Sequence, residues 1–284
     1  MSARAIRPWR VRRAAQRTVD GAINLAIAAF ALGPIMWGLS TSLKPTEDIL
    51  LYPPQILPER PTLAHYRLLF ETGIHGPILN STIVSIGAVL LSLGIGTTAA
   101  YAVARMKFRG KSALLFFIVA LMSIPLPSLI VPTFTFLANV GLTNSLLGLV
   151  LLYAAYQIPL VVWILSAYFS SLPVELEHAA LIDGYSRFAT LRKIVLPLSG
   201  PGLVAAGLFV VTFAWNDFVV AVAMISAADI KTLPVAIYGY LGFYGRDWGP
   251  LTAAAIISIL PVIAMFVFFQ KYFLSGMTSG GSKS

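Results

Sequence analysis

The chain has 284 residues, of which 58% are hydrophobic and 11% are charged, and its formal net charge is +9. Soluble domains usually carry about 25% charged residues, so this composition excludes an ordinary soluble enzyme or binding domain. The chain contains no cysteine, which excludes disulfides and thiolate metal sites.

Six apolar segments follow one another along the chain, and each is long enough to cross a bilayer as a helix, which takes roughly 20 residues. The basic and then apolar N-terminus looks like a signal peptide, but its apolar run is too long and no small-residue cleavage site follows, so we interpret it as an uncleaved first span. The sequence predicts an all-α membrane protein with an N-terminal segment at 1–19, a six-span domain at 20–274 and a C-terminal tail at 275–284. We expect the spans near 20–44, 78–104, 113–138, 145–170, 201–226 and 249–274.

Basic residues are distributed unevenly between the two sides of this predicted topology. Most of the 20 Lys and Arg lie in the N-terminal segment, after the second span, before the fifth span and at the C-terminal end. The opposite side holds only Lys44, Arg60, Arg67, Lys231 and Arg246. Because cytoplasmic loops carry an excess of Lys and Arg, both termini and the loop at 172–200 are expected in the cytoplasm. Topology therefore explains the net charge, and no nucleic-acid partner is expected.

The first external loop, at 45–76, is long, rich in proline and of mixed charge. It is either a contact surface for an external protein or a linker. Further along, Pro125, Pro127 and Pro132 interrupt the third span. Proline frees backbone carbonyls, which membranes tolerate only where neighbouring helices or water satisfy them. These prolines predict a bend beside a cavity, with a packing kink as the alternative.

The fourth and fifth spans carry side chains that could face a pathway. Tyr156 and Gln157 could stack on or hydrogen-bond a substrate, although aromatic residues in spans are more often packing or interface anchors. Asp217 is the only acidic residue well inside a predicted span, where a charge is costly unless it is paired or hydrated. Asn216 and Asp217 therefore face a pathway or an external gate, or Asp217 holds two helices together as an ion-pair partner or N–H acceptor.

The loop at 172–200 has the pattern of two short helices joined at a glycine. Glu175 and Glu177 fall in the first turn, where negative charge complements the helix dipole. Gly184 can break the helix, Ser186 can cap the second helix, and Pro197 can end it. Such a rigid projection is suited to binding another protein. The alternative is a pair of amphipathic helices resting on lipid headgroups.

Enzyme signatures are weak throughout the chain. Gly110-Lys111-Ser112 resembles the end of a phosphate-binding loop, but Arg105 stands where the first glycine is required. The three histidines are scattered and form no ligand cluster. Energy for the protein's work is therefore expected from a gradient or from a partner.

The segment His178-Ala179-Ala180, then Asp183-Gly184 and Ile194-Val195-Leu196-Pro197, resembles the EAA loop of ABC importer permeases. His178 stands where the family usually has glutamate, and Glu177 next to it could take part of that role. Matches outside the loop resemble the smaller permease subunit of maltose-type carbohydrate importers. They are Asn80-Ser81, Tyr101 to Arg105, Phe213 to Asp217, and the end of the chain from Ser275 to Gly281.

This resemblance implies the type I importer permease fold and a membrane complex. The implied partners are a larger permease subunit, two cytoplasmic ATPase subunits and an extracytoplasmic substrate-binding protein, in a bacterial cytoplasmic membrane. ATP and Mg would bind the ATPase subunits, and this chain would be neither an enzyme nor a cofactor carrier. The implied substrate is a di- or oligosaccharide.

The resemblance also assigns roles to residues of this chain. The coupling loop to the ATPase would use Glu175, Glu177, His178, Ala179, Ala180, Asp183, Gly184, Arg187, Ile194, Leu196 and Pro197. The pathway or gate candidates are Tyr156, Gln157, Asn216, Asp217, Pro125 and Pro127. The last external loop would enter the binding protein through Tyr240, Phe243, Tyr244 and Gly245, and the tail would reach the ATPase through Thr278, Ser279 and Gly280.

Three other functions are weighed against this one. A gradient-driven transporter usually has internal repeats and several buried ionisable residues, and the sequence offers no convincing repeat and one buried acid. A membrane scaffold would not need broken helices. Within the importer class, a permease for a polyol phosphate such as glycerol phosphate is the main alternative.

Overall fold

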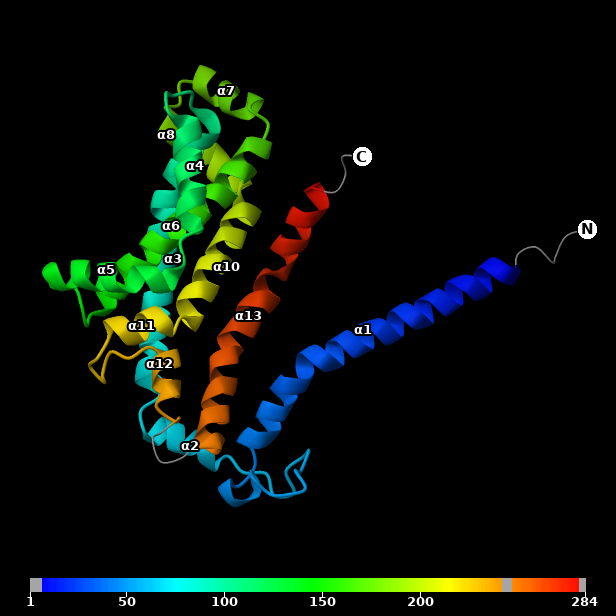
Figure 1. The fold of residues 1–284 in the computed structure, drawn as a ribbon. Helices are drawn as coiled ribbons and strands as arrows, with labels where there is room; N and C mark the ends of the chain where they lie inside the picture. The colour runs from blue at the N-terminus through cyan, green and yellow to red at the C-terminus, as the bar shows by residue number, and fades with distance from the viewer. Residues whose placement is uncertain (1–6, 242–246, 281–284) are drawn as a thin grey trace, which may run out of the picture. The chain divides into compact units, whose positions relative to one another are not determined.

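The computed structural model describes residues 7–241 and 247–280, with side chains for 16–241 and 247–271. All regular structure in this described part is helical (Figure 1). The chain divides into two compact units, one of Met1–Glu71 with Tyr240–Ile257 and one of Thr72–Gly239 with Ser258–Ser284.

The first unit contains the long helix α1 (Arg7–Ser42), the short 3-10 helix η1 (Thr46–Asp48), α2 (Ala64–Glu71) and the beginning of α13 (Trp248–Gly280). The predicted external loop lies in this unit up to Glu71. Lys44 is buried, and its Nζ donates to the Gln55 carbonyl at 2.6 Å and lies over the Trp37 ring. His65 packs so closely on Gly249 that a side chain there would collide with its ring.

The second unit carries the remaining helices, and its core lies between α3 (His75–Arg105), α6 (Leu146–Ser171) and α10 (Gly200–Asn216). Around them lie α4 (Lys111–Met122), α5 (Leu126–Asn139), α7 (Glu175–Ile182), α8 (Arg187–Thr190), the π-helix η2 (Leu191–Val195), α9 (Leu196–Leu198), α11 (Val219–Met224), α12 (Leu233–Tyr238) and the rest of α13.

Close contact between α3 and α6 depends on small residues. A Cβ at Gly96 would collide with Val161, and one at Gly87 would press on Val150. Apolar helices gain little from leaving lipid for one another, so close backbone approach at glycine supplies the packing that holds such helices together. The α3–α6 pair makes the most extensive helix–helix contact of the unit, and the other helices lie around it.

Four described helices are long and apolar enough to cross a membrane. They are Gln16–Ser42 within α1, α3, α6 and Trp248–Lys271 within α13, and they confirm the predicted first, second, fourth and sixth spans. The helix α13 continues to Gly280, so the predicted tail begins within a helix.

The predicted third span is bent, as its prolines indicate, and the predicted fifth span is broken. In the third, α4 and α5 meet at 99°. The break falls next to Pro125, as its missing N–H favours, whereas Pro132 is accommodated inside α5. In the fifth, α10 ends at Asn216 because Asp217 is extended, and α10 meets the preceding helical stretch Arg187–Leu198 at 83°. Asp217 therefore lies at a break between two helices and not within one continuous helix.

Candidate functional site: a loop held at one end of the helical bundle

The turn between α7 and α8 is fixed by backbone geometry. Gly184 has φ +85°, a conformation that L side chains rarely adopt. The Tyr185 N–H donates to the Ala180 carbonyl and the Gly184 N–H to the Leu181 carbonyl, which together make a Schellman motif. The predicted helix break at Gly184 is confirmed, and it sets the direction in which the chain leaves α7.

The second helix of the loop begins where the sequence indicates. The Ser186 Oγ accepts the N–H of Ala189 at 3.2 Å, so Ser186 is the predicted cap. The helix does not end at Pro197. A π-helical turn, η2, absorbs the change in hydrogen bonding before Pro197, and the helical stretch continues to Leu198. Buried Leu191 and Val195 fix this stretch to the core.

One face of the loop is joined to the end of α3 by a buried ion pair. Glu177 is only 5% exposed, and its Oε1 accepts from Arg105 Nε at 2.6 Å. Its Oε2 accepts from the Tyr101 hydroxyl at 2.9 Å, and Arg105 Nη2 also donates to the Leu172 carbonyl at 2.9 Å. Buried charges need such partners, since an unpaired one is strongly destabilising. Glu177 therefore faces inward to this cluster, although it was among the residues expected to contact an ATPase.

The opposite face of the loop is exposed. Ile182 is 85% exposed and Phe188 is 66% exposed, on either side of the Gly184 turn. His178 and Arg187 are also exposed, and the Lys193 Nζ lies 4.7 Å from the centre of the Tyr185 ring. Exposed large apolar side chains accompanied by charges are typical of a protein-binding surface. Of the other residues predicted for this loop, Glu175, Ala179, Asp183 and Pro197 are exposed, Ile194 and Leu196 are half-buried, and Ala180 is buried.

A second carboxylate, that of Asp217, joins the broken fifth span to α6. Its Oδ2 accepts from the Tyr153 hydroxyl at 2.7 Å and from the N–H groups of Val220 and Ala221 at 3.1 and 3.0 Å. The last two bonds satisfy the first turn of α11, where negative charge also complements the helix dipole. This arrangement corresponds to the alternative in which Asp217 is an N–H acceptor holding two helices together.

The segment after α11 is held by polar side chains at the same end of the unit. The Asn144 Oδ1 accepts from the N–H groups of Ser226 and Ala227, and Asn80 Nδ2 donates to the carbonyls of Asp229 and Lys231. Asn144 adopts φ +55°, a conformation that Asn tolerates better than most residues. The beginning of α3 thus fixes this segment, as the end of α3 fixes the α7–α8 loop.

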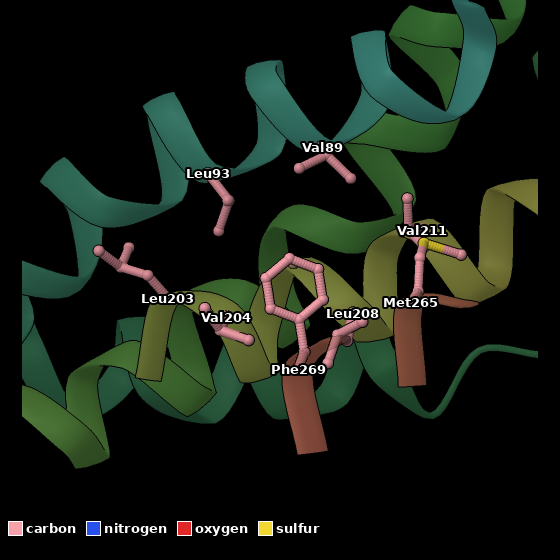
Figure 2. A pocket seen from close by; sticks show the side chains of 9 residues that line it. Val89, Leu93, Leu203, Val204, Leu208, Val211, Met265 and Phe269 are labelled. Carbon is pink, nitrogen blue, oxygen red and sulfur yellow. The ribbon is translucent and has the colours of Figure 1, made fainter. Parts of the chain in front are cut away.

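Two cavities in this unit differ in their chemistry. One, of about 290 Å³, is lined only by apolar side chains of α3, α10 and α13; Figure 2 shows Val89 and Leu93 facing Val204 and Leu208, with the Phe269 ring between them. The other, of about 310 Å³, lies under the α4–α5 bend and includes the amide of Gln157 and the ring of Tyr156. Of these two cavities, only the second is lined by hydrogen-bonding side chains.

The structure brings only some of the predicted pathway residues together. Tyr156 and Gln157 line the polar cavity, and Pro125 forms the bend above it. Asn216 is exposed, and its amide donates to its own helix at Thr212. Pro127 is exposed in the first turn of α5.

Other predicted contacts fall partly outside the described residues. Tyr240 is half-buried, whereas Phe243, Tyr244 and Gly245 lie outside the residues that the structure describes. Thr278, Ser279 and Gly280 belong to the last turns of α13, without described side chains.

Sequence reasoning missed the partners of Glu177 and Asp217. Neither Tyr101 nor Arg105 was linked to Glu177, and Tyr153 was not linked to Asp217. The tyrosines themselves could have predicted a polar partner, since the hydroxyl of a tyrosine near a span end needs a hydrogen-bond partner when it is buried. The pairing itself joins residues 76 and 64 positions apart, which no local pattern specifies.

The comparisons with known proteins agree on one family. The model of the family described as "binding-protein-dependent transport system inner membrane component" matches residues 92–279. The trehalose/maltose transport permease protein MalG of Thermococcus litoralis is 37% identical over 269 residues, covering 93% of this chain and 95% of the relative. The sulfoquinovosyl glycerol transport permease protein SmoH of Agrobacterium fabrum is 36% identical, covering 89% of each chain.

A solved structure extends the likeness to the fold. A chain of a bacterial ABC transporter involved in import of the acidic polysaccharide alginate superposes with a TM-score of 0.80 over 96% of this chain and 99% of its own. The two sequences are 22% identical, so this likeness concerns the fold, which is that of type I ABC importer permeases.

Proposed function

Because the chain belongs to the family of binding-protein-dependent inner membrane transport components, and is a permease subunit and not itself an ATPase, we propose that it forms half of the pathway of a carbohydrate importer. The substrate class rests on the relatives, two of which are named as permeases for trehalose/maltose and for a sulfoquinovosyl glycerol. A di- or oligosaccharide is the substrate that this chain would carry.

The α7–α8 loop carries this proposal. Its inner face is bound to α3 through Glu177, Arg105 and Tyr101, and its outer face offers Ile182 and Phe188 to a partner. An ATPase subunit that binds the outer face would move the inner face with it. The Glu177–Arg105 ion pair ties the loop to α3, so the loop would not move separately from that helix. The end of α3 would then follow, and α6 with it through their close packing.

This mechanism requires a membrane unit with two states and a partner that binds one state better. A switch from 1:99 to 99:1 takes roughly 5.5 kcal/mol of differential binding, which nucleotide binding at two ATPase sites can supply. The complex would include a larger permease, two ATPase subunits with ATP and Mg, and an external binding protein. The loop and both chain ends would lie in the cytoplasm, as the distribution of Lys and Arg predicts.

Two further contacts complete the proposed complex. The segment around Tyr240 to Gly245 would enter the cleft of the binding protein, and Thr278 to Gly280 would reach the ATPase dimer. The first rests on the mixture of aromatic residues and glycine, and the second on the resemblance of the tail to the family pattern. Serine substitutions at Phe243, Tyr244 and Gly245 should lower uptake while leaving the ATPase bound.

Co-purification tests the coupling loop directly. Gly184→Val introduces backbone strain at φ +85° and should redirect α8, so the ATPase should no longer co-purify with the permease from mild detergent. Gly141→Val is the matched control, because Gly141 also has positive φ and open space around its Cβ position but joins α5 to α6. Equal recovery of the ATPase with both variants would contradict the proposal.

A further inference from the structure

The cavity under the α4–α5 bend has the composition of a ligand site. Its volume of about 310 Å³ falls at the lower end of the range for small-molecule sites. Its walls are mostly aliphatic, from Leu121, Met122, Leu126 and Leu160, with the Phe213 ring from α10. Apolar walls with a few placed polar groups are the usual construction of such sites.

The decisive feature of this cavity is the side chain of Gln157. It is 8% exposed, yet its amide makes no hydrogen bond within the described residues. The amide is not sealed in the core either, because its nitrogen and oxygen atoms are not fully enclosed by the protein. A buried amide has two donors and an acceptor that need partners. Gln157 lines the cavity, so a ligand there could supply the partner that its amide lacks.

Tyr156 supplies a second polar group beside the amide. Its hydroxyl lies 3.2 Å from Thr133 Oγ1, and Thr133 in turn lies 2.5 Å from the Leu129 carbonyl. Thr133 has one proton, which the short contact to Leu129 takes, so the Tyr156 hydroxyl donates to Thr133. The Tyr156 oxygen is left with lone pairs free to accept a hydrogen bond from a ligand.

The cavity has no charged lining residue, which indicates a neutral ligand. A phosphate or carboxylate would call for Arg, Lys or a helix N-terminus. A sugar ring instead offers hydroxyls that both donate and accept, and carbon–hydrogen faces that pack on aromatic and aliphatic walls. The neighbouring apolar cavity has the walls without the polar groups.

We propose that this cavity is a sugar-binding subsite of this permease subunit, in which the Gln157 amide and the Tyr156 hydroxyl bind hydroxyls of a neutral sugar. The proposal rests on the carbohydrate function proposed above and adds that this chain touches the substrate itself. The residues that line the cavity come from α4, α5, α6 and α10, so a change in the α4–α5 bend would open or close the subsite during transport.

The absence of cysteine makes a direct test available. The complete transporter carrying Gln157→Cys is reconstituted in liposomes and labelled with a small methanethiosulfonate reagent, with ATP, the binding protein and maltose or trehalose as probes. The sugar should slow labelling at least about fivefold. Thr135→Cys, an exposed site on α5 outside the cavity lining, is the control and should label equally fast with and without sugar.

Transport by Gln157→Leu gives the second readout. Loss of the amide should lower the rate of sugar uptake about tenfold, while ATP hydrolysis stimulated by the binding protein persists. The discrimination between the sugar and an analogue lacking one hydroxyl should also shrink in this variant. Full uptake with unchanged discrimination would mean that the cavity holds only water, and would overturn the subsite.

The two proposals fail in different ways. Uptake of either sugar by the unsubstituted transporter, together with unprotected labelling of Gln157→Cys, would overturn the subsite and leave the carbohydrate importer standing. An unsubstituted transporter that assembles and hydrolyses ATP but carries none of a panel of di- and oligosaccharides would overturn both.

Discussion

Two hydrogen-bonded carboxylates of the second unit, buried Glu177 and half-buried Asp217, are stabilised in different ways. Glu177 is paired with a cation, Arg105, and with the Tyr101 hydroxyl, near the end of the bundle that carries α7 (Figure 1). Asp217, towards α11 and α12, has no cation among its described hydrogen-bond partners and is held by the Tyr153 hydroxyl and two backbone N–H groups. Both carboxylates bind a tyrosine of a long core helix and fix a shorter helix to it.

The different partners of Glu177 and Asp217 indicate which of the two carboxylates would transmit motion from one chain segment to another. The ion pair joins side chains of two separate elements and also holds the chain entering the loop, through the Leu172 carbonyl. Two of the three bonds at Asp217 are local and only begin the helix that follows. We therefore infer that the Glu177 connection couples the loop to the bundle, whereas the Asp217 connection chiefly shapes the break in the fifth span.

The largest expected effect comes from Arg105→Met. The substitution leaves the Glu177 carboxylate buried without its cation, a change that typically costs about 3–5 kcal/mol. We expect a large fall in the thermal midpoint of the detergent-purified protein, measured by loss of monodisperse material on heating.

The double variant Arg105→Met with Glu177→Gln is the control for that prediction. Removing both charges leaves no uncompensated ion, so stability should return to within about 1–2 kcal/mol of the unsubstituted protein. A double variant as unstable as Arg105→Met alone would show that packing of Arg105, and not its charge, is what matters.

At the other carboxylate, Asp217→Leu should lower the free energy of unfolding by about 2–4 kcal/mol. The substitution leaves a tyrosine hydroxyl and two N–H groups without their acceptor. Asp217→Asn should cost less than Asp217→Leu, since one amide oxygen can take the place of Oδ2, which accepts all three bonds. Thermal midpoints of the two variants measure the difference. Equal loss in both would mean that charge and not acceptor geometry dominates.

Tyr101→Phe and Tyr153→Phe compare the two sites by the same small change. Each substitution removes one hydrogen bond to a carboxylate, so each should lower the free energy of unfolding by about 1–2 kcal/mol. The two variants are measured side by side by thermal unfolding in one detergent. A loss at Tyr101 well above that at Tyr153 would mean that the Tyr101 hydroxyl, in addition to Arg105, is essential for holding Glu177.

The smallest effect on stability, and a specific effect on assembly, is expected from Ile182→Glu. Its side chain is 85% exposed, so stability should change by no more than about 0.5 kcal/mol. Recovery of the ATPase should nevertheless fall, because the apolar contact is lost. Leu57→Glu, at a site 73% exposed in the first unit, is the matched control and should leave recovery unchanged.

Much of this architecture could be read from local patterns. Apolar runs of sufficient length predicted α1, α3, α6 and α13, and Gly184 and Ser186 predicted the turn and cap of the loop. These features depend on composition and on backbone preferences of single residues, so neighbours in the sequence determine them. The bend at Pro125 was predictable for the same reason.

The remainder depended on contacts between distant segments. The break after Asn216 contains no proline and only becomes understandable when Tyr153 and α11 are placed around Asp217. The inward direction of Glu177 likewise depends on Arg105, which lies on another helix. Hydropathy counts Glu177 and His178 alike as polar loop residues, although one is buried and the other exposed.

The measurement that tests the coupling role of Glu177 most directly is the ratio of sugar taken up to ATP hydrolysed. It is made in liposomes with the complete transporter carrying Arg105→Met and Glu177→Gln, whose loop keeps its outer face intact. We predict that the ATPase still binds and hydrolyses ATP while maltose or trehalose uptake per ATP falls at least about fivefold. An unchanged ratio in this variant would contradict the account.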